Sequence, residues 1–239
     1  MLPPKTGSTS LRHLLARSNC GHSLITSTIA HELPDPASTA PLHALLSNGR
    51  GVATLREPCS RFVSAVSHLQ LLANSRGTRT PPHPYQTVLG SPDPVVLTTL
   101  MLANESLRRL VRGDGALLNS SRVAGLMVFW PQARWSGRGT GVSNWWCLPT
   151  LARDVAAFAS IAGCRVGPGA APHLRYHTAA CAYASRQRLG GLANHSLHVC
   201  KQLEDWTRGF PSLCARVASL YPEDQQLWHE RCVDREGRR

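Results

Sequence analysis

The segment that most constrains the fold is residues 51–77, because it changes from a strand pattern to a helix pattern within a single tight turn. GVATLRE, at 51–57, has the length and composition of a short buried strand. Pro58 follows at a first helical position, where its missing N–H group costs nothing. Apolar side chains then recur at helical spacing to about Gly77, at Phe62, Val63, Val66 and Leu69. The segment therefore predicts a strand that passes directly into a helix.

Similar patterns follow along the chain. Asp93 and Pro94 are a suitable N-cap and first residue for a helix that runs to about Gly113. Arginines 108, 109 and 112 lie near its end, where we expect a solvated face that the helix dipole favours. Further predicted elements are helices over 8–17, 151–163, 196–208, 212–221 and 223–231, a second buried strand, VAGLMVFW, over 123–130, and loops over 78–92 and 131–146.

Strands that alternate with helices predict an α/β architecture with a parallel sheet. The chain has 239 residues, 42% of them hydrophobic, which suits a single domain over 1–239 with a substantial core. Ligands of such sheets bind beyond the carboxyl ends of the strands. We therefore expect Lys5–Ser10 and Arg56–Ser64 to lie at the same edge.

The loop over 5–10 has the features of an anion site. Its small residues let successive backbone N–H groups converge, the helix that follows presents its positive end, and Lys5 can reach the same anion. The Walker A pattern is absent because the lysine precedes the glycine, which disfavours an ordinary ATPase. A turn that caps a helix for structural reasons fits the same residues.

The segment REPCSRFVS, at 56–64, provides a second candidate anion site. Arg56 ends the predicted strand, and Ser64 lies about two turns inside the helix, so both side chains can face one crevice. A guanidinium fork and a hydroxyl suit a phosphate. Arg61 fits either the same role or that of a surface or structural cation.

The arrangement of two phosphate-type sites on neighbouring strand-to-helix junctions resembles that of a known family. PPKTGSTSL (3–11) is similar to the 5′-phosphosulfate loop, and REPCSRFVS to the 3′-phosphate segment, of sulfotransferases that use 3′-phosphoadenosine 5′-phosphosulfate (PAPS). The resemblance is strongest to Golgi carbohydrate enzymes, including heparan sulfate 2-O- and 6-O-sulfotransferases. Weaker matches are CGHS (20–23), VFWPQARW (128–135), LPTLARDVAAF (148–158) and the Tyr-x-x-Asp helix LYPEDQQLW (220–228).

The resemblance implies a three-layer, P-loop NTPase-like α/β fold and a role for each matched residue. Lys5 would neutralise the departing phosphate oxygen, and His22 would take the proton of the acceptor hydroxyl, with His31 and Glu32 as alternative bases. The 3′-phosphate would lie on Arg56 and Ser64. The 5′-phosphosulfate would be held by Lys5, Thr6, Gly7, Ser8, Thr9 and Ser10. PAPS would be the co-substrate, a carbohydrate or proteoglycan the acceptor, and no metal is implied.

Family members have a full strand before the lysine loop, whereas only Met1 and Leu2 precede Pro3 here. We therefore expect the first strand to be largely missing and the chain to be truncated at its N-terminus. The complete form would be a single-pass type II membrane protein of the Golgi lumen. Three N-x-[ST] sequons, at Asn104, Asn119 and Asn194, favour such a lumen. The eight cysteines fit disulfides or buried thiols.

Other functions fit parts of the same pattern. The net charge of +12 favours anionic partners in general, so a non-catalytic module that binds sulfated glycans is one alternative. A sulfotransferase acting on protein tyrosine or on a small molecule is another. Dispersed arginines without a recognition motif disfavour nucleic acid. The tryptophans at 130, 135, 145 and 146 suit either a sugar cleft or, for at least two of them, the core.

Overall fold

The computed structural model describes residues 51–75, 93–114, 128–136, 142–161, 205–206 and 208–234. The strand β1 (Gly51–Leu55) confirms the first predicted strand, which is two residues shorter than expected. It pairs in parallel with β2 (Val142–Cys147), from Gly51 opposite Val142 to Leu55 opposite Cys147. The described residues are mostly helical with this two-stranded parallel sheet, and the expected α/β architecture stays a prediction. A three-layer, P-loop-like fold around the sheet also stays a prediction.

Two of the elements predicted from sequence, the strand over 123–130 and the loop over 131–146, are wrong. Val128–Trp130, the described end of the expected strand over 123–130, is a short helical turn and a bend rather than a strand. The strand β2 instead begins inside 131–146, where we expected only a loop, and continues to Cys147. A 3-10 helix, η4 (Gln132–Ser136), precedes it. Short apolar runs do not distinguish strands from buried turns by periodicity alone.

The helix α3 (Pro58–Ser75) follows β1 as predicted, with Pro58 as its first residue. The helix expected over 94–113 is divided at Asn104 into α5 (Pro94–Ala103) and α6 (Glu105–Arg112). Asp93 caps α5 as expected, because its carboxylate accepts hydrogen bonds from the backbone N–H groups of Val95 and Val96. Gly113, at φ +71°, ends α6 in the left-handed region.

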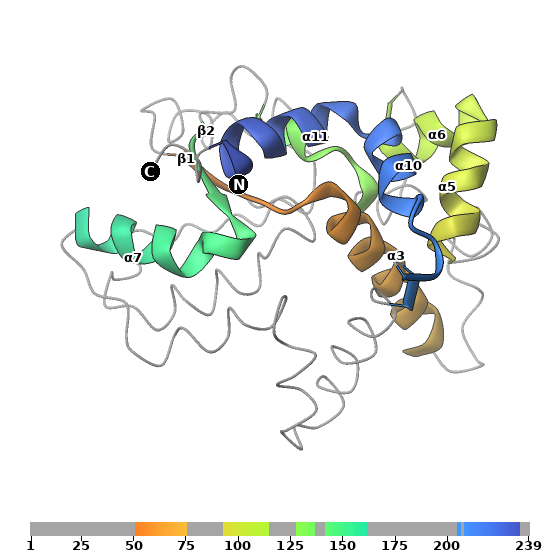
Figure 1. Ribbon diagram of the computed structural model, residues 1–239, viewed down its shortest axis with the longest axis horizontal. Helices are drawn as coiled ribbons and strands as arrows, with labels where there is room; N and C mark the ends of the chain where they lie inside the picture. The colour runs from red at the N-terminus through yellow and green to blue at the C-terminus, as the bar shows by residue number, and fades with distance from the viewer. Residues whose placement is uncertain are drawn as a thin grey trace, which may run out of the picture.

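The C-terminal part confirms two predicted helices, with changed ends. The helix α10 (Leu213–Leu220) is followed by α11 (Pro222–Trp228), which continues as the π-helical turn η7 (His229–Val233). The predicted helix over 151–163 is α7 (Leu151–Ile161), and the short 3-10 helix η5 (Leu148–Thr150) joins it to β2. Figure 1 shows α7 at one end, α5, α6 and α10 at the other, and the two strands between α7 and α3. Within the described ranges, no helix has both the length and the apolar character needed to cross a membrane.

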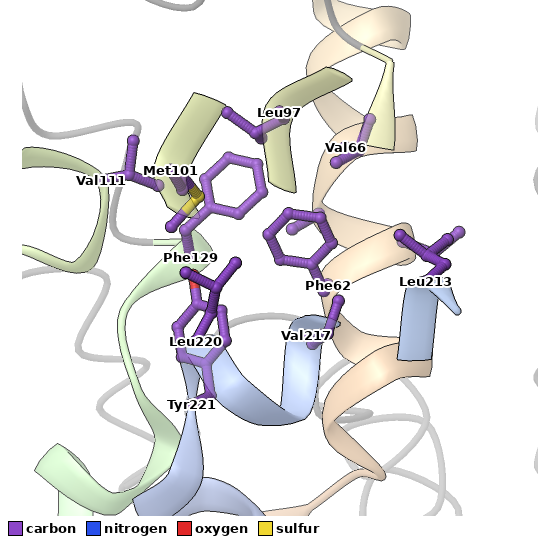
Figure 2. Packing of buried hydrophobic residues seen from close by; sticks show 12 residues of the cluster. Phe62, Val66, Leu97, Met101, Val111, Phe129, Leu213, Val217, Leu220 and Tyr221 are labelled. Carbon is purple, nitrogen blue, oxygen red and sulfur yellow. The ribbon is translucent and has the colours of Figure 1, made fainter. Parts of the chain in front are cut away.

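The larger core packs α3 against α5 and α10 (Figure 2). Phe62 lies at its centre, with its ring centroid 5.4 Å from that of Phe129 and 6.1 Å from that of Tyr221. The members with the largest side chains are Phe62, Leu97, Met101, Phe129, Leu213, Leu220 and Tyr221. A disulfide between Cys59 and Cys214 joins α3 to α10 beside this core.

A smaller apolar cluster surrounds the strands. Ala53, Leu55 and Trp145 are buried there with the disulfide between Cys147 and Cys232. This disulfide fastens the carboxyl end of β2 to η7. Both described disulfides therefore join parts of the chain that are far apart in sequence. One connects α10 to α3, and the other connects η7 to β2.

Candidate functional site

The candidate site is the junction where β1 ends and α3 begins. Arg56 and Glu57 form the whole connection between Leu55 and Pro58. The connection lies at the carboxyl end of β1, next to the carboxyl end of its parallel partner. This is the edge at which ligands of parallel sheets bind.

Glu57 caps α3 with its own side chain. Its two carboxylate oxygens accept hydrogen bonds from the backbone N–H groups of Cys59, at 2.9 Å, and Ser60, at 2.6 Å. These groups are among the donors that the first turn of a helix leaves unpaired. Because Glu57 already uses them and places a negative charge there, an anion at this junction has to be held by side chains.

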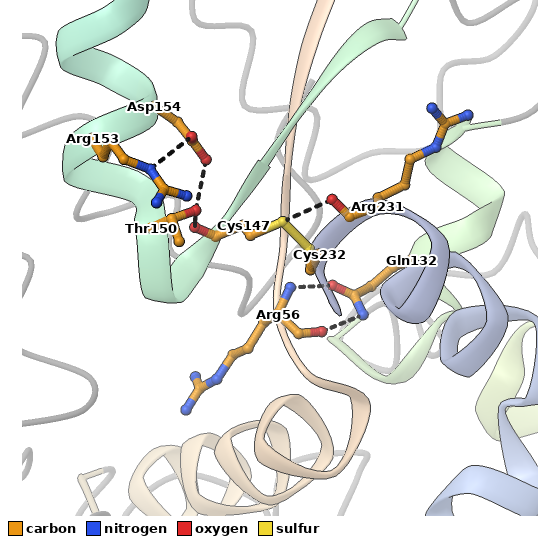
Figure 3. Close-up of a disulfide and its surroundings, with 8 residues drawn as sticks. All are labelled: Arg56, Gln132, Cys147, Thr150, Arg153, Asp154, Arg231 and Cys232. Carbon is orange, nitrogen blue, oxygen red and sulfur yellow. Dashed lines mark hydrogen bonds and ion pairs between the residues drawn. A yellow bond between two sulfur atoms is a disulfide. The ribbon is translucent and has the colours of Figure 1, made fainter. Parts of the chain in front are cut away.

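Gln132 holds the main chain of Arg56 with two hydrogen bonds (Figure 3). The backbone N–H of Arg56 donates to Oε1 of Gln132 at 2.9 Å, and Nε2 of Gln132 donates to the carbonyl of Arg56 at 2.8 Å. The Gln132 side chain is fully buried, so both bonds are protected from water. The direction in which Arg56 leaves the strand is therefore determined by η4.

The two candidate phosphate ligands of this segment are Arg56, at the junction, and Ser64, which lies inside α3. The guanidinium of Arg56 extends away from Gln132 and from the nearby disulfide (Figure 3), and the residue is buried, with 6% of its surface exposed. Ser64 is partly exposed on the second turn of α3. Among the described residues, nothing forms a hydrogen bond with the Ser64 hydroxyl.

Arg61 is a structural cation. It is 2% exposed, and one guanidinium nitrogen donates to the backbone carbonyl of Val128 at 3.1 Å. The other terminal nitrogen forms an ion pair with Asp224 at 3.2 Å, and Asp224 is fully buried. Of the two roles that the sequence allowed for Arg61, the structure favours the structural one, since its charge is balanced within the protein.

Asp224 also connects this ion pair to the residue that holds Arg56. Its second carboxylate oxygen accepts a hydrogen bond from the backbone N–H of Ala133 at 2.8 Å. Ala133 follows Gln132 in η4, so Asp224 fixes the turn from which Gln132 reaches Arg56. A continuous set of polar contacts, most of them buried, thus runs from α11 to the end of β1.

Arg112 departs from the exposed role that we expected at the end of α6. It forms ion pairs with Asp114, at 2.7 Å, and with Glu223, and it donates to the backbone carbonyl of Leu220. Its side chain is only 16% exposed. Burial by itself would lower the pKa of Arg112, but hydrogen bonds and charge from Asp114 and Glu223 outweigh this and raise it.

Tyr221 lies between Arg61, which is buried, and Arg112, which is partly exposed. Its ring centroid is 5.7 Å from the guanidinium carbon of Arg61 and 5.4 Å from that of Arg112. The hydroxyl is buried and finds no hydrogen-bond partner in the described part of the chain. Burial, as the largest cause, raises the pKa of Tyr221 well above its ordinary value.

Three of the four tryptophans considered for a sugar cleft are core residues. Trp130, Trp145 and Trp146 are each at most 7% exposed. The indole of Trp146 packs edge-on against Phe158 at 5.3 Å, and Arg134 lies 5.4 Å from the ring of Trp130. Core packing of at least two tryptophans is therefore confirmed.

The remaining predicted site residues lie outside the described residues: Lys5, Thr6, Gly7, Ser8, Thr9, Ser10 and His22, with the alternative bases His31 and Glu32. The structure adds Glu57, Gln132 and Asp224, to which we assigned no role from sequence. Asp224 belongs to the Tyr-x-x-Asp pattern, but an acidic residue in the first turn of a helix is also explained by the helix dipole. Within the residues described, no cluster of three or more histidine, cysteine or acidic side chains suits a metal ion.

Comparison of the chain with models of protein families, with curated protein sequences and with solved structures finds no significant match.

Proposed function

We propose that this protein is a sulfotransferase that transfers a sulfuryl group from PAPS to a hydroxyl of a carbohydrate. The observation that carries the proposal is the β1–α3 junction, where Gln132 holds the main chain of Arg56 at the carboxyl end of a parallel strand. Glu57 occupies the backbone donors of the helix start. A phosphate there would depend on Arg56 and Ser64, and this pair is the one that the resemblance assigns to the 3′-phosphate.

In the proposed reaction, the loop over residues 5–10 forms the second half of the donor site and binds the 5′-phosphosulfate. The acceptor oxygen would attack sulfur as the bond from sulfur to the bridging phosphate oxygen breaks. Lys5 would neutralise the charge that develops on that oxygen, and His22 would take the acceptor's proton. In-line positioning of donor and acceptor would supply most of the rate enhancement.

The compartment proposed for this reaction is the Golgi lumen, with the complete protein anchored as a type II membrane protein around a three-layer α/β domain. The disulfides Cys59–Cys214 and Cys147–Cys232 support an oxidising compartment. They are also incompatible with a fold in which all eight cysteines are free thiols.

Calorimetric titration with adenosine 3′,5′-bisphosphate tests the donor site. We expect binding by the full chain, about 10- to 100-fold weaker binding after Arg56→Met, and a smaller loss after Ser64→Ala, because a charged hydrogen bond contributes about 1.5–3 kcal/mol. Arg153→Met is the matched control, since Arg153 is 52% exposed on α7 and the change removes the same charge. Absence of binding by the folded wild-type chain would refute the proposal.

A transfer assay separates the enzyme from a non-catalytic module that only binds sulfated glycans. Radiolabelled PAPS is incubated with desulfated glycosaminoglycans, with a tyrosine peptide and with small phenols. We expect label in a glycan, and we expect Lys5→Ala and His22→Ala to reduce transfer while the nucleotide still binds. Binding without transfer to any acceptor would favour the non-catalytic module, and label in the peptide or phenol would change the acceptor class.

A further inference from the structure

One sequence motif that the proposed function does not use lies at the break between α5 and α6. Asn104, Glu105 and Ser106 form an N-x-[ST] sequon, and all three residues are exposed. Asn104 has extended backbone angles, φ −130° and ψ 103°, between two helical segments. Figure 1 shows this break at the end of the structure occupied by α5 and α6, away from the two strands.

The hydrogen bonds of Asn104 determine which atom of its amide faces water. Its Oδ1 accepts from the backbone N–H of Leu107 at 3.0 Å, which caps α6. Its own backbone N–H donates to Leu100, and its carbonyl accepts from Arg108, each at 2.9 Å. Within the described part of the chain, Nδ2 has no partner. The cap therefore orients the amide with oxygen toward the helix and nitrogen toward solvent.

Nδ2 is the atom to which N-linked sugars are attached, so the cap and the modification use different atoms of one side chain. The two described disulfides favour an oxidising compartment, and the secretory compartments of this kind are where such modification occurs. The exposed sequon and the disulfides are separate observations that agree on the same environment.

We propose that Asn104 is an N-glycosylation site. Nδ2 attacks the anomeric carbon of a lipid-linked oligosaccharide, a carbon–nitrogen bond forms, and the bond from that carbon to the lipid diphosphate breaks. The amide loses one proton, and the lipid diphosphate is the leaving group. The helix cap persists, because the modified amide retains its Oδ1 acceptor.

The proposal bears on the apolar side chains that are exposed to water on α5, next to Asn104. Leu100, one helical turn before Asn104, is 42% exposed, and Leu102 is 44% exposed. A glycan on Asn104 starts beside Leu100 and covers part of its exposed surface, whereas Leu102, two positions before Asn104, faces another side of the helix. Because the α5–α6 break lies away from the two strands (Figure 1), we expect donor binding to be independent of the glycan.

Peptide mass spectrometry tests the site directly. The full chain is produced in a eukaryotic secretory pathway behind a cleavable signal peptide, and the peptide that contains Asn104 is analysed before and after treatment with peptide N-glycosidase. We expect a glycopeptide that the enzyme converts to a peptide with aspartate at 104. An unmodified Asn104 in folded chain with both disulfides formed would overturn the proposal.

Three variants distinguish loss of the sugar from loss of the helix cap. Asn104→Asp keeps the capping oxygen and lacks Nδ2, Ser106→Ala keeps Asn104 and breaks the sequon, and Ser106→Thr keeps the sequon. We expect the first two variants to migrate faster than wild type on a denaturing gel, by the mass of one glycan, and the third to migrate as wild type does. Equal mobility of all three variants and wild type would contradict the proposal. Unchanged nucleotide binding in Ser106→Ala would support independence from the donor site.

Discussion

Two ion pairs at the start of α11 have the same chemistry in different surroundings. Arg61 pairs with Asp224, and both side chains are at most 2% exposed. Arg112 pairs with the adjacent Glu223, but these side chains are 16% and 34% exposed. The guanidiniums of both arginines contact the ring of Tyr221. One aromatic ring thus lies between a fully buried pair and a pair that reaches water.

The difference in exposure determines what each pair contributes. Breaking a buried pair leaves a charge that water cannot solvate, whereas the partner of a broken surface pair is rehydrated. The buried pair also continues through Ala133 to Gln132 and Arg56. We therefore expect the Arg61–Asp224 pair to hold the candidate site in place and to contribute strongly to the free energy of unfolding. The Arg112–Glu223 pair should contribute little to it.

The largest expected effect is that of Asp224→Ala. It leaves Arg61 buried without its carboxylate and removes the acceptor of the Ala133 N–H group, so we expect a loss of about 3–5 kcal/mol in the free energy of unfolding. Urea denaturation followed by tryptophan fluorescence measures this loss. Asp224→Asn retains an acceptor of similar shape and should lose less. Equal, small losses for both variants would show that the buried charge is unimportant.

The disulfide Cys59–Cys214 fixes α3 to α10 two residues before Arg61. The double variant Cys59→Ala/Cys214→Ala should lose about 2–5 kcal/mol of stability, because the bond closes a long loop in the unfolded chain, with a sequence separation of 155 between its cysteines. Chemical denaturation under non-reducing conditions measures the change. If the double variant is as stable as wild type, the ion pair and the apolar core hold these helices together without the bond.

Tyr221→Phe is expected to have an effect only in alkaline solution. Because burial raises the pKa of Tyr221, the folded chain keeps this proton above pH 10 while the unfolded chain releases it. The unfolded state then binds fewer protons, and wild-type stability falls as pH rises above about 10. The variant lacks this loss.

We expect the stability of Tyr221→Phe relative to wild type to be constant below about pH 9 and to increase by about 1.4 kcal/mol for each pH unit above 10. Urea denaturation between pH 8 and pH 11 measures the relative stability. A constant difference across this range would mean that Tyr221 ionises in the folded protein at its ordinary pKa.

The smallest expected effect is that of Glu223→Gln. Glu223 is 34% exposed, and Arg112 keeps Asp114 as a second partner, so the loss should be about 0–1 kcal/mol and should shrink in 1 M salt. Thermal denaturation at low and high salt provides the measurement. A loss as large as that of Asp224→Ala would contradict the division into a buried pair and a surface pair.

Local signals in the sequence predicted local structure well. Pro58 begins α3 and Asp93 caps α5 as expected, because each feature depends on residues within one helical turn. The apolar run at Phe129 and Trp130 is buried as expected, but it is not a strand. Burial follows from composition, whereas the choice between strand and turn depends on neighbours that the run itself does not specify.

The contacts that build the candidate site are not local. Arg56 is 76 positions from Gln132, Arg61 is 163 positions from Asp224, and Arg112 is 111 positions from Glu223. Side chains that meet across such separations carry no spacing signal, so Arg112 was expected at the surface and Gln132 received no role. Arg56 and Ser64 were recognisable because they belong to one strand-to-helix segment.

The pairing of Arg61 with Asp224 also limits how early in synthesis the candidate site can be completed. At about 5–20 residues per second, the 163 positions between them take on the order of ten seconds or more to add. Until then, Arg61 lacks the Asp224 carboxylate with which it pairs in the folded protein. A nascent chain of this protein therefore assembles its proposed donor site late, when α11 reaches it.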